Sequence, residues 1–217
     1  MWTLCPILYA SPNPQSEIRN YQDVYCPVFN SPYAVSPWRL YRGTKSMKGY
    51  VQVYTGDGKG KTTAAIGLAI RSLGAGWRVF IAQFLKAGEY SEHKALAKFS
   101  DRLTIRTYGR NVFIKGKPEE EDRRLAQAAY EEISEIVASG RYRLVILDEA
   151  NVAVHYGLIT VEQILDLIDR RAEEVELVIT GHYAHPRLID RADLVTEMSE
   201  VKHYFHRGIK ARVGVEK

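Results

Sequence analysis

A glycine- and lysine-rich run at residues 55–63 carries the residue types that bind phosphate groups. It reads Thr-Gly-Asp-Gly-Lys-Gly-Lys-Thr-Thr. Glycines let successive backbone N–H groups point at one anion, and a helix that follows adds the partial positive charge of its N-terminus. In such a loop Lys61 reaches the outer phosphates, and the Thr62 hydroxyl binds a Mg²⁺ ion. The run therefore predicts a phosphate-binding loop.

One position departs from the usual pattern of this loop. The common form begins with Gly five positions before Gly60, and this chain has Thr55 there. The flanks are those of a phosphate loop, because an alternating strand-like segment (50–54) precedes it and a helix-forming segment (64–70) follows it. A flexible linker or a basic turn is the alternative, and these flanks disfavour both. We expect a phosphate loop that differs from the common NTPase form.

A pair of acids, Asp148 and Glu149, follows four apolar residues at 144–147. This is the form of a Walker B element, in which a carboxylate at a strand end neutralises charge and holds the magnesium ion or its water. Two solvated acids at a turn are the alternative. The spacing leaves open which of the two carboxylates touches the metal.

The elements that must position these residues alternate regularly along the chain. Pro118 and the acids after it predict a helix start with favourable dipole interactions. Ser91 is predicted to cap a short helix through Phe99, and Thr160 to open another with a capping box. Helices between strands imply an α/β fold with a doubly wound, mainly parallel sheet, helices on both faces, and ligands at the carboxyl ends of the strands. The predicted strands are 50–54, 78–84, 103–108, 144–147, 176–180 and 194–198.

Composition narrows the class of protein. The chain has 217 residues, of which 46% are apolar, and a net charge of +4. This suits one domain with a sizeable core, and the small, interspersed basic excess predicts no nucleic-acid partner. No apolar run approaches the roughly 20 residues that span a membrane, and the start lacks a signal peptide's basic region. The two cysteines have no CxxC spacing, so we expect a cytoplasmic protein without a zinc site or disulfide framework.

The composition changes near Met47. Residues 1–46 hold six of the eight prolines and both cysteines, without helical or strand periodicity. Such a segment can hardly build a core of its own. We therefore expect an irregular extension at 1–46 and one domain at 47–217, and interpret Met47 as the biological start, with 1–46 a misassigned upstream translation. The alternative is a genuine arm that packs on the domain or on a second subunit.

Several further runs follow the phosphate loop in a fixed order: Gln83–Lys86, Leu147–Glu149, Val178–Gly181, Val195–Met198, Val201–Phe205 and Gly208–Glu216. With the loop, the set resembles the ATP:corrinoid adenosyltransferases of the cob(I)yrinic acid a,c-diamide type. The resemblance covers residues 48–216 and none of 1–46. It implies a P-loop fold and transfer of the 5′-deoxyadenosyl group of ATP to the Co(I) of a reduced corrinoid, with release of triphosphate. It further implies Mg²⁺, a homodimer, and an electron donor such as a flavoprotein.

The resemblance also implies roles for individual residues. Thr62 and Glu149, with Asp148 as the second candidate, would hold Mg²⁺, and Lys61 would act on the departing triphosphate. Gln83 would line the same sheet end. Phe113, with Tyr108 as second choice, would press on the lower face of the corrinoid and so make reduction to Co(I) easier. The residues expected to contact triphosphate are Gly56, Asp57, Gly58, Lys59, Gly60, Lys61, Thr62 and Thr63.

Two features depart from the family's pattern or invite another interpretation. His182 stands where relatives usually carry Arg, which predicts weaker or pH-dependent phosphate binding. His155 and His203 are expected to cap or pack near loops rather than to bind metal. The runner-up function is a generic P-loop ATPase or small-molecule kinase that releases ADP, and a third is a nucleotide-binding regulator without turnover.

Overall fold

Six parallel strands form the centre of the fold, in the order β3-β2-β4-β5-β1-β6. This confirms the predicted doubly wound α/β fold. The computed structural model describes residues 47–86, 90–110 and 118–216. The extension predicted at 1–46 lies outside the described residues. The strands are β1 Val51–Thr55, β2 Val79–Phe84, β3 Leu103–Tyr108, β4 Leu144–Asp148, β5 Glu176–Thr180 and β6 Leu194–Glu197.

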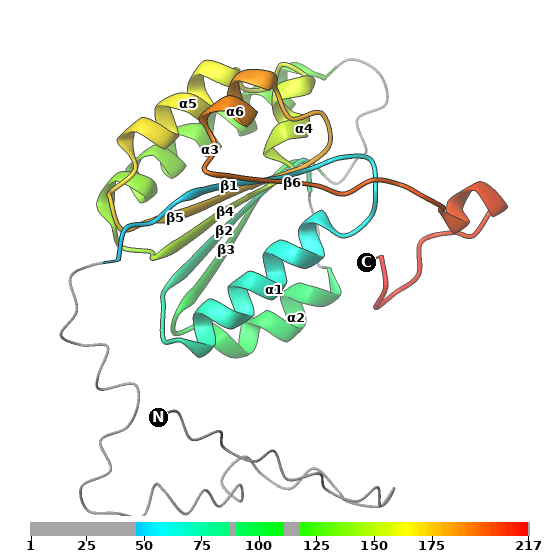
Figure 1. Ribbon diagram of the computed structural model, residues 1–217, viewed down its shortest axis with the longest axis horizontal. Coiled ribbons are helices and arrows are strands. Elements are labelled where there is room, and N and C mark those ends of the chain that lie inside the picture. Colours follow the sequence, from blue (N-terminus) through cyan, green and yellow to red (C-terminus); the bar gives the residue numbers. More distant parts are fainter. Residues whose placement is uncertain (1–46, 87–89, 111–117, 217) are drawn as a thin grey trace, which may run out of the picture. The chain divides into compact units, whose positions relative to one another are not determined.

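Helices cover both faces of the sheet (Figure 1). On one face, α1 (Lys61–Gly74) and α2 (Ser91–Leu96) enclose a cluster of buried apolar residues that includes Ala69, Ile81 and Ile146. The other face is covered by α3 (Glu120–Ser139), α4 (Ala150–His155), α5 (Val161–Arg170) and α6 (Pro186–Arg191). The larger cluster lies there and includes Phe80, Ile133 and Leu167. Burial on both faces explains why β2 and β4 are apolar except for Gln83 and Asp148 near their carboxyl ends.

Local sequence signals account for both ends of α3 and for the start of α5. The first turn of α3 is acidic and its C-cap is Gly140 in the left-handed region, with φ 62°, which glycine adopts without strain. Thr160 caps α5 by accepting a hydrogen bond from the N–H of Gln163 at 3.1 Å, which confirms the predicted capping box. The predicted cap at Ser91 is wrong by one residue. Ser91 is the first residue of α2, and Tyr90 takes the N-cap position because its N–H donates to His93 Nδ1 at 3.4 Å.

The register of the strands brings distant polar residues to one edge of the sheet. Gln83 on β2 is paired with Asp148 on β4, and Tyr54 on β1 is paired with Thr180 on β5. All these strands end at the same edge because the sheet is parallel. Within the ranges described above, no helix combines the length and apolar character needed to cross a bilayer.

Candidate active site

The phosphate loop joins the end of β1 to the start of α1. Gly56 and Gly60 have φ of 95° and 123°, values that a residue with a Cβ rarely adopts. The buried ammonium of Lys61 lies inside the loop, where its Nζ donates to the carbonyl oxygens of Gly56 and Gly58 at 2.7 Å each. Burial lowers the pKa of Lys61, and nearby acids counteract it. The loop is thus wrapped around the cation expected to reach phosphate.

The loop also rests against the chain that leaves β6. The Gly58 N–H donates to the Met198 carbonyl at 2.6 Å. A Cβ on Gly56 would lie 2.4 Å from that same oxygen, and one on Gly58 would lie 2.7 Å from it. Close backbone approach therefore requires glycine at both positions, and the positive φ is a second reason for glycine at Gly56. Neither requirement applies to Thr55, which ends β1 as an ordinary strand residue.

Asp148 is the centre of a buried hydrogen-bond network at the end of β4. Its Oδ1 accepts from Thr62 Oγ1 at 2.8 Å and from Thr180 Oγ1 at 2.7 Å. Its Oδ2 lies 2.6 Å from Lys86 Nζ and 3.2 Å from Gln83 Nε2. Burial alone would raise the pKa of Asp148, but Lys86 and the hydroxyl donors hold it below its usual range. The phosphate loop and three strands of the sheet meet at this carboxylate.

Glu149 differs from its neighbour in conformation and surroundings. It has φ 61°, in the left-handed region, and its N–H donates to Thr180 Oγ1 at 3.1 Å. This turn directs the chain into α4 and leaves the Glu149 side chain at the wall of two clefts. Burial and the nearby Asp148 charge raise the pKa of Glu149. A carboxylate whose charge is disfavoured by burial and by a second carboxylate suits a divalent cation.

Two clefts open on either side of these residues. One, of about 290 Å³, is lined by loop residues 57–63, Glu149, His182, His203, Val215 and Glu216. The other, of about 540 Å³, extends from Thr62 and Glu149 toward Lys86, Tyr90 and α2. Val215 and Glu216 border both. The larger cleft therefore extends from Glu149 toward the end of β2.

One residue of the hydrogen-bond network around Asp148, His93, is not predicted from the sequence. His93 on α2 lies with Nε2 2.5 Å from Gln83 Oε1, and Gln83 in turn contacts Asp148. His93 thereby connects α2 to the carboxylate network. Its spacing on a short polar helix carries no signal for this role, because the contact depends on how α2 packs against β2.

His182 lies at the end of β5 beside the loop, as a half-buried residue that lines the smaller cleft. Burial lowers its pKa, and the nearby Lys61 charge lowers it further.

The next residue, Tyr183, has φ 60°, and its ring stacks on His155 with centroids 4.2 Å apart. His203 Nδ1 accepts from the Phe205 N–H at 3.0 Å and caps the short helical turn Tyr204–Arg207. The prediction that His155 and His203 pack or cap is confirmed.

Tyr108, the second choice for contacting the corrinoid, lies on the edge strand β3, with three strands between it and β1, which leads into the phosphate loop. Tyr108 ends β3, where its hydroxyl donates to Glu132 on α3 at 2.7 Å and its ring packs on Phe84. Burial and Glu132 raise the pKa of Tyr108. Phe113 lies outside the described residues. Of the other predicted residues, Gly56 to Thr63, Gln83, Asp148, Glu149 and His182 all meet at one edge of the sheet.

Comparison with known proteins identifies relatives over the same part of the chain. Residues 47–216 match the family described as ATP:corrinoid adenosyltransferase BtuR/CobO/CobP. A corrinoid adenosyltransferase of Pseudomonas aeruginosa is 36% identical over 170 residues, which cover 78% of this chain and 84% of that protein. One from Sinorhizobium is 35% identical over 172 residues (78% and 80%), and one from Escherichia coli K12 is 30% identical over 170 (78% and 86%). The chain is therefore a transferase of the ATP:corrinoid adenosyltransferase BtuR/CobO/CobP family.

Proposed function

We propose that this protein transfers the 5′-deoxyadenosyl group of ATP to the Co(I) of a reduced corrinoid and releases inorganic triphosphate. The observation that carries the proposal is the meeting of Lys61, Thr62, Asp148 and Glu149 at one sheet edge, in a chain of this family. In this reaction a bond forms between the cobalt and the ribose 5′ carbon, and the bond from that carbon to the triphosphate oxygen breaks. The protein therefore has to bind the triphosphate and keep it in position while its bond to the 5′ carbon breaks.

The phosphate loop is suited to that task. Its backbone N–H groups and the N-terminus of α1 would bind phosphate oxygens, and Lys61 would exchange its carbonyl partners for a phosphate. Each charge-assisted hydrogen bond contributes roughly 1.5–3 kcal/mol. Several such bonds account for binding in the micromolar range, about −8 kcal/mol, after the costs of association. The same groups would stabilise the charge that develops on the departing triphosphate.

The polar residues at this edge fit a magnesium ion. Among the residues that the structure describes, no group of three or more His, Cys, Asp or Glu side chains is arranged to hold a metal. Mg²⁺ typically takes one or two carboxylates together with phosphate oxygens and water. Glu149, which lines both clefts, would be the direct ligand, with the Thr62 hydroxyl beside it and Asp148 holding that hydroxyl in place. When bound, the ion supplies positive charge next to the triphosphate.

The chemical step needs no general base. A cobalt lone pair attacks the 5′ carbon, a Co–C bond forms, and the electrons of the C–O bond leave with the triphosphate. The family is understood to hold ATP in reversed orientation along its loop, and Thr55 in place of the first glycine is compatible with this. The 5′ carbon would then face the second substrate.

The remaining elements of the proposal concern the corrinoid and its reduction. Phe113, or Tyr108 as second choice, would press on the lower face of the corrinoid and keep an axial ligand off the cobalt. Reduction to Co(I) would then occur at a less negative potential, with an electron from a donor such as a flavoprotein. We also propose that the protein acts as a homodimer in the cytoplasm.

An anaerobic assay with ATP, Mg²⁺ and chemically reduced cob(I)alamin tests the proposal. The corrinoid spectrum and the release of triphosphate are followed together, and both products are expected in equal amounts. ADP without a spectral change would instead identify an ATPase, which also releases phosphate, or a kinase, which transfers the phosphoryl group to an acceptor. Neither product, with both substrates supplied, would identify a nucleotide-binding regulator.

A further inference from the structure

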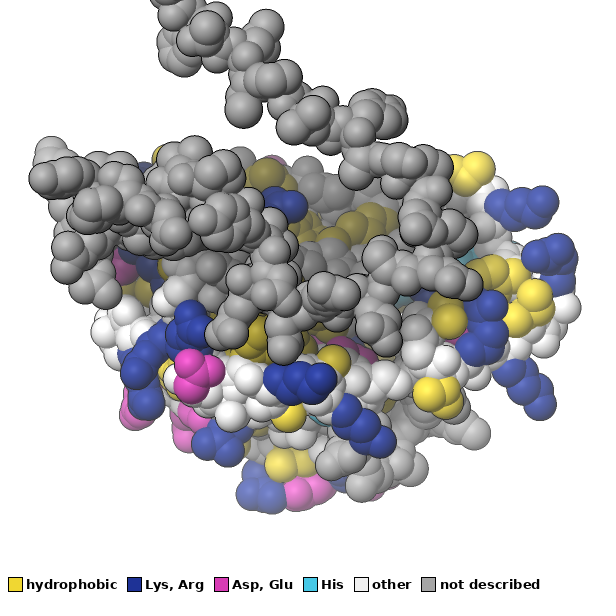
Figure 2. All heavy atoms as spheres, turned by 90° about the horizontal axis from the view of Figure 1, so that it is seen from below, with side chains coloured by type: hydrophobic (Ala, Val, Ile, Leu, Met, Phe, Trp, Pro, Cys, Tyr) yellow, Lys and Arg dark blue, Asp and Glu magenta, His cyan; other side chains and the backbone are white. Residues whose placement is uncertain are grey.

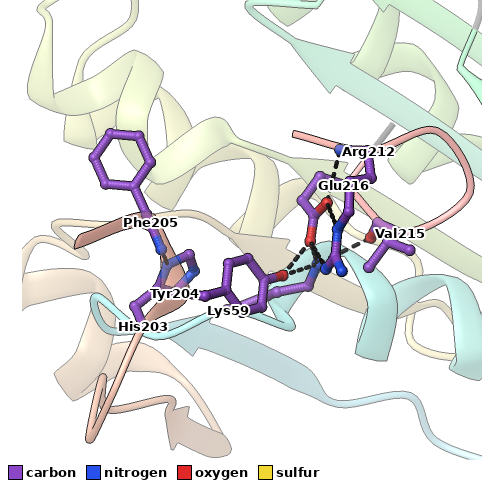
Figure 3. Close-up of polar contacts among 7 residues, drawn as sticks. All are labelled: Lys59, His203, Tyr204, Phe205, Arg212, Val215 and Glu216. Carbon is purple, nitrogen blue, oxygen red and sulfur yellow. Dashed lines mark hydrogen bonds and ion pairs between the residues drawn. The ribbon is translucent and has the colours of Figure 1, made fainter. Parts of the chain in front are cut away.

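The C-terminal segment at residues 198–216 ends against the phosphate loop (Figure 3). Lys59, in the middle of the loop, donates through Nζ to Glu216 Oε1 at 2.8 Å and to the Val215 carbonyl at 2.9 Å. Tyr204 Oη lies 3.3 Å from the same Nζ. The partners of Lys59 are thus more than 140 residues away in the sequence. This contact joins the end of the chain to the site.

The carboxylate of Glu216 is surrounded by donors. Arg212 donates to it through its backbone N at 2.8 Å, through Nη2 at 3.1 Å and through Nε at 3.2 Å, and Tyr204 donates its hydroxyl. The Arg212 guanidinium also lies 4.8 Å from the centroid of the Tyr204 ring. Arg212, Lys59 and Tyr204 hold the pKa of Glu216 well below its usual range. A guanidinium, an ammonium and a phenol are donors that bind phosphate as readily as carboxylate.

The position of this carboxylate relates it to the substrate. Glu216 and Lys59 line the smaller cleft together with Lys61, Thr62 and Glu149. A negative charge thus already lies at the rim of the cleft where the charge of a triphosphate has to be neutralised. The Glu216 carboxylate would therefore compete for Lys59 with a phosphate group that binds in the loop.

Polar contacts, rather than a core, hold this segment. Val201, Phe205 and Val213 are 95%, 69% and 79% exposed, and in Figure 3 the Phe205 ring points away from the cluster around Lys59. The segment carries four Lys or Arg residues against two Glu residues, and basic and apolar side chains gather at the right-hand end of the face in Figure 2. Little apolar surface would be exposed if the segment shifted, and its charge favours an anion.

We propose that Arg212 and Tyr204 bind the triphosphate together with Lys59, and that Glu216 is an internal anion which a phosphate group of the nucleotide displaces. This inference rests on the proposed function, because it assigns residues to the same nucleotide. It makes the C-terminal segment part of the binding site. It also predicts that Glu216 and Arg212, although paired, act on nucleotide affinity in opposite directions.

Calorimetric titration with MgATP, and separately with inorganic triphosphate and Mg²⁺, tests that prediction. Glu216→Gln removes the competing charge, and we expect both ligands to bind about tenfold more tightly. Arg212→Gln removes a phosphate donor, and we expect about tenfold weaker binding, with partial rescue in Arg212→Lys. Glu200→Gln is the matched control, because this Glu lies on the same segment but contacts His206 at 2.6 Å through its side chain. Thermal unfolding of each variant checks the fold.

The outcomes separate this inference from the proposed function. If wild-type protein binds both ligands but Glu216→Gln and Arg212→Gln shift affinity in the same direction, or not at all, the ion pair only fastens the segment and the inference is overturned. If wild-type protein binds neither ligand, the proposed function itself is contradicted. Opposite shifts with an unchanged Glu200→Gln variant support the inference.

Discussion

Lys86 and Asp148 form a buried ion pair, with Nζ and Oδ2 2.6 Å apart and side chains that are 16% and 2% exposed. Lys86 follows β2 and Asp148 ends β4, so the pair connects two neighbouring strands at the site. A pair of nearly the same length joins Arg191 and Asp169 at 2.7 Å, but its side chains are 52% and 64% exposed. The two pairs differ mainly in burial.

This difference predicts unequal effects of removing one partner. Lys86→Met leaves a buried carboxylate without its counter-charge, and we expect the free energy of unfolding to fall by about 3 kcal/mol. Asp169→Asn breaks the exposed pair and should cost less than about 1 kcal/mol. Urea denaturation measures both values. Similar costs for the two variants would contradict the view that burial makes Asp148 depend on Lys86.

Lys61 should be required for catalysis rather than for folding. Its ammonium contacts only the loop carbonyls of Gly56 and Gly58 among the hydrogen bonds that the structure describes. Lys61→Ala removes the cation expected at the triphosphate, and we expect turnover to fall by about a hundredfold or more. The control is Lys98→Ala, on an exposed turn after α2. Wild-type rates in a folded Lys61→Ala protein would overturn the phosphate-loop assignment.

Two glycines, one in the phosphate loop and one in the helix that follows it, should respond in opposite ways to alanine. Gly56 has φ 95°, and a Cβ there would lie 2.4 Å from the Met198 carbonyl. Gly56→Ala should therefore both lower stability and weaken triphosphate binding. Gly67 lies inside α1, where a Cβ would meet nothing within 4 Å. Gly67→Ala should raise the free energy of unfolding by up to about 1 kcal/mol, since alanine favours the helix.

Thermal unfolding with and without triphosphate measures both effects of these glycine substitutions. An unchanged Gly56→Ala protein would show that the loop is not held in its shape by the contact with Met198. Loss of stability in Gly67→Ala would contradict the gain expected from the helix propensity of alanine.

The sequence predicts the helices and strands whose ends are determined by residues close together in the chain. Pro118 and the acids after it predict the start of α3. The apolar run before Asp148 located β4. By contrast, α4 was not predicted, because it has six residues and follows β4 directly through Glu149 in the left-handed region. A helix that short is determined by its packing on the sheet and carries little periodicity of its own.

The sequence alone also does not predict which distant residues contact each other at the site. The run of Gln83 to Lys86 was expected near the phosphate loop, but not that Lys86 would pair with Asp148. Likewise, nothing in the spacing of Lys59 and Glu216 indicates that they meet. Such pairs depend on strand order and on the path of the chain after β6, which residue types alone do not specify.

His182 gives a pH dependence whose sign follows from its surroundings. Its pKa lies below the usual 6.5 because it is partly buried and close to Lys61. In the unfolded chain the imidazole takes up a proton more readily, so its contribution to stability is present above about pH 6.5 and is lost as the pH falls through the folded pKa. A bound phosphate acts in the opposite direction, because its charge favours the imidazolium.

Triphosphate should therefore bind wild-type protein more tightly, relative to His182→Gln, as the pH is lowered from 7.5 toward 5.5. The ratio of the two affinities cancels the titration of the phosphate itself. His182→Arg supplies a permanent charge, so it should bind about tenfold more tightly than His182→Gln at every pH. Calorimetry at fixed free Mg²⁺ measures all three proteins. Equal affinities of wild-type and His182→Gln protein across this range would mean that the imidazole does not contact phosphate, and that His182 serves only to pack beside the loop.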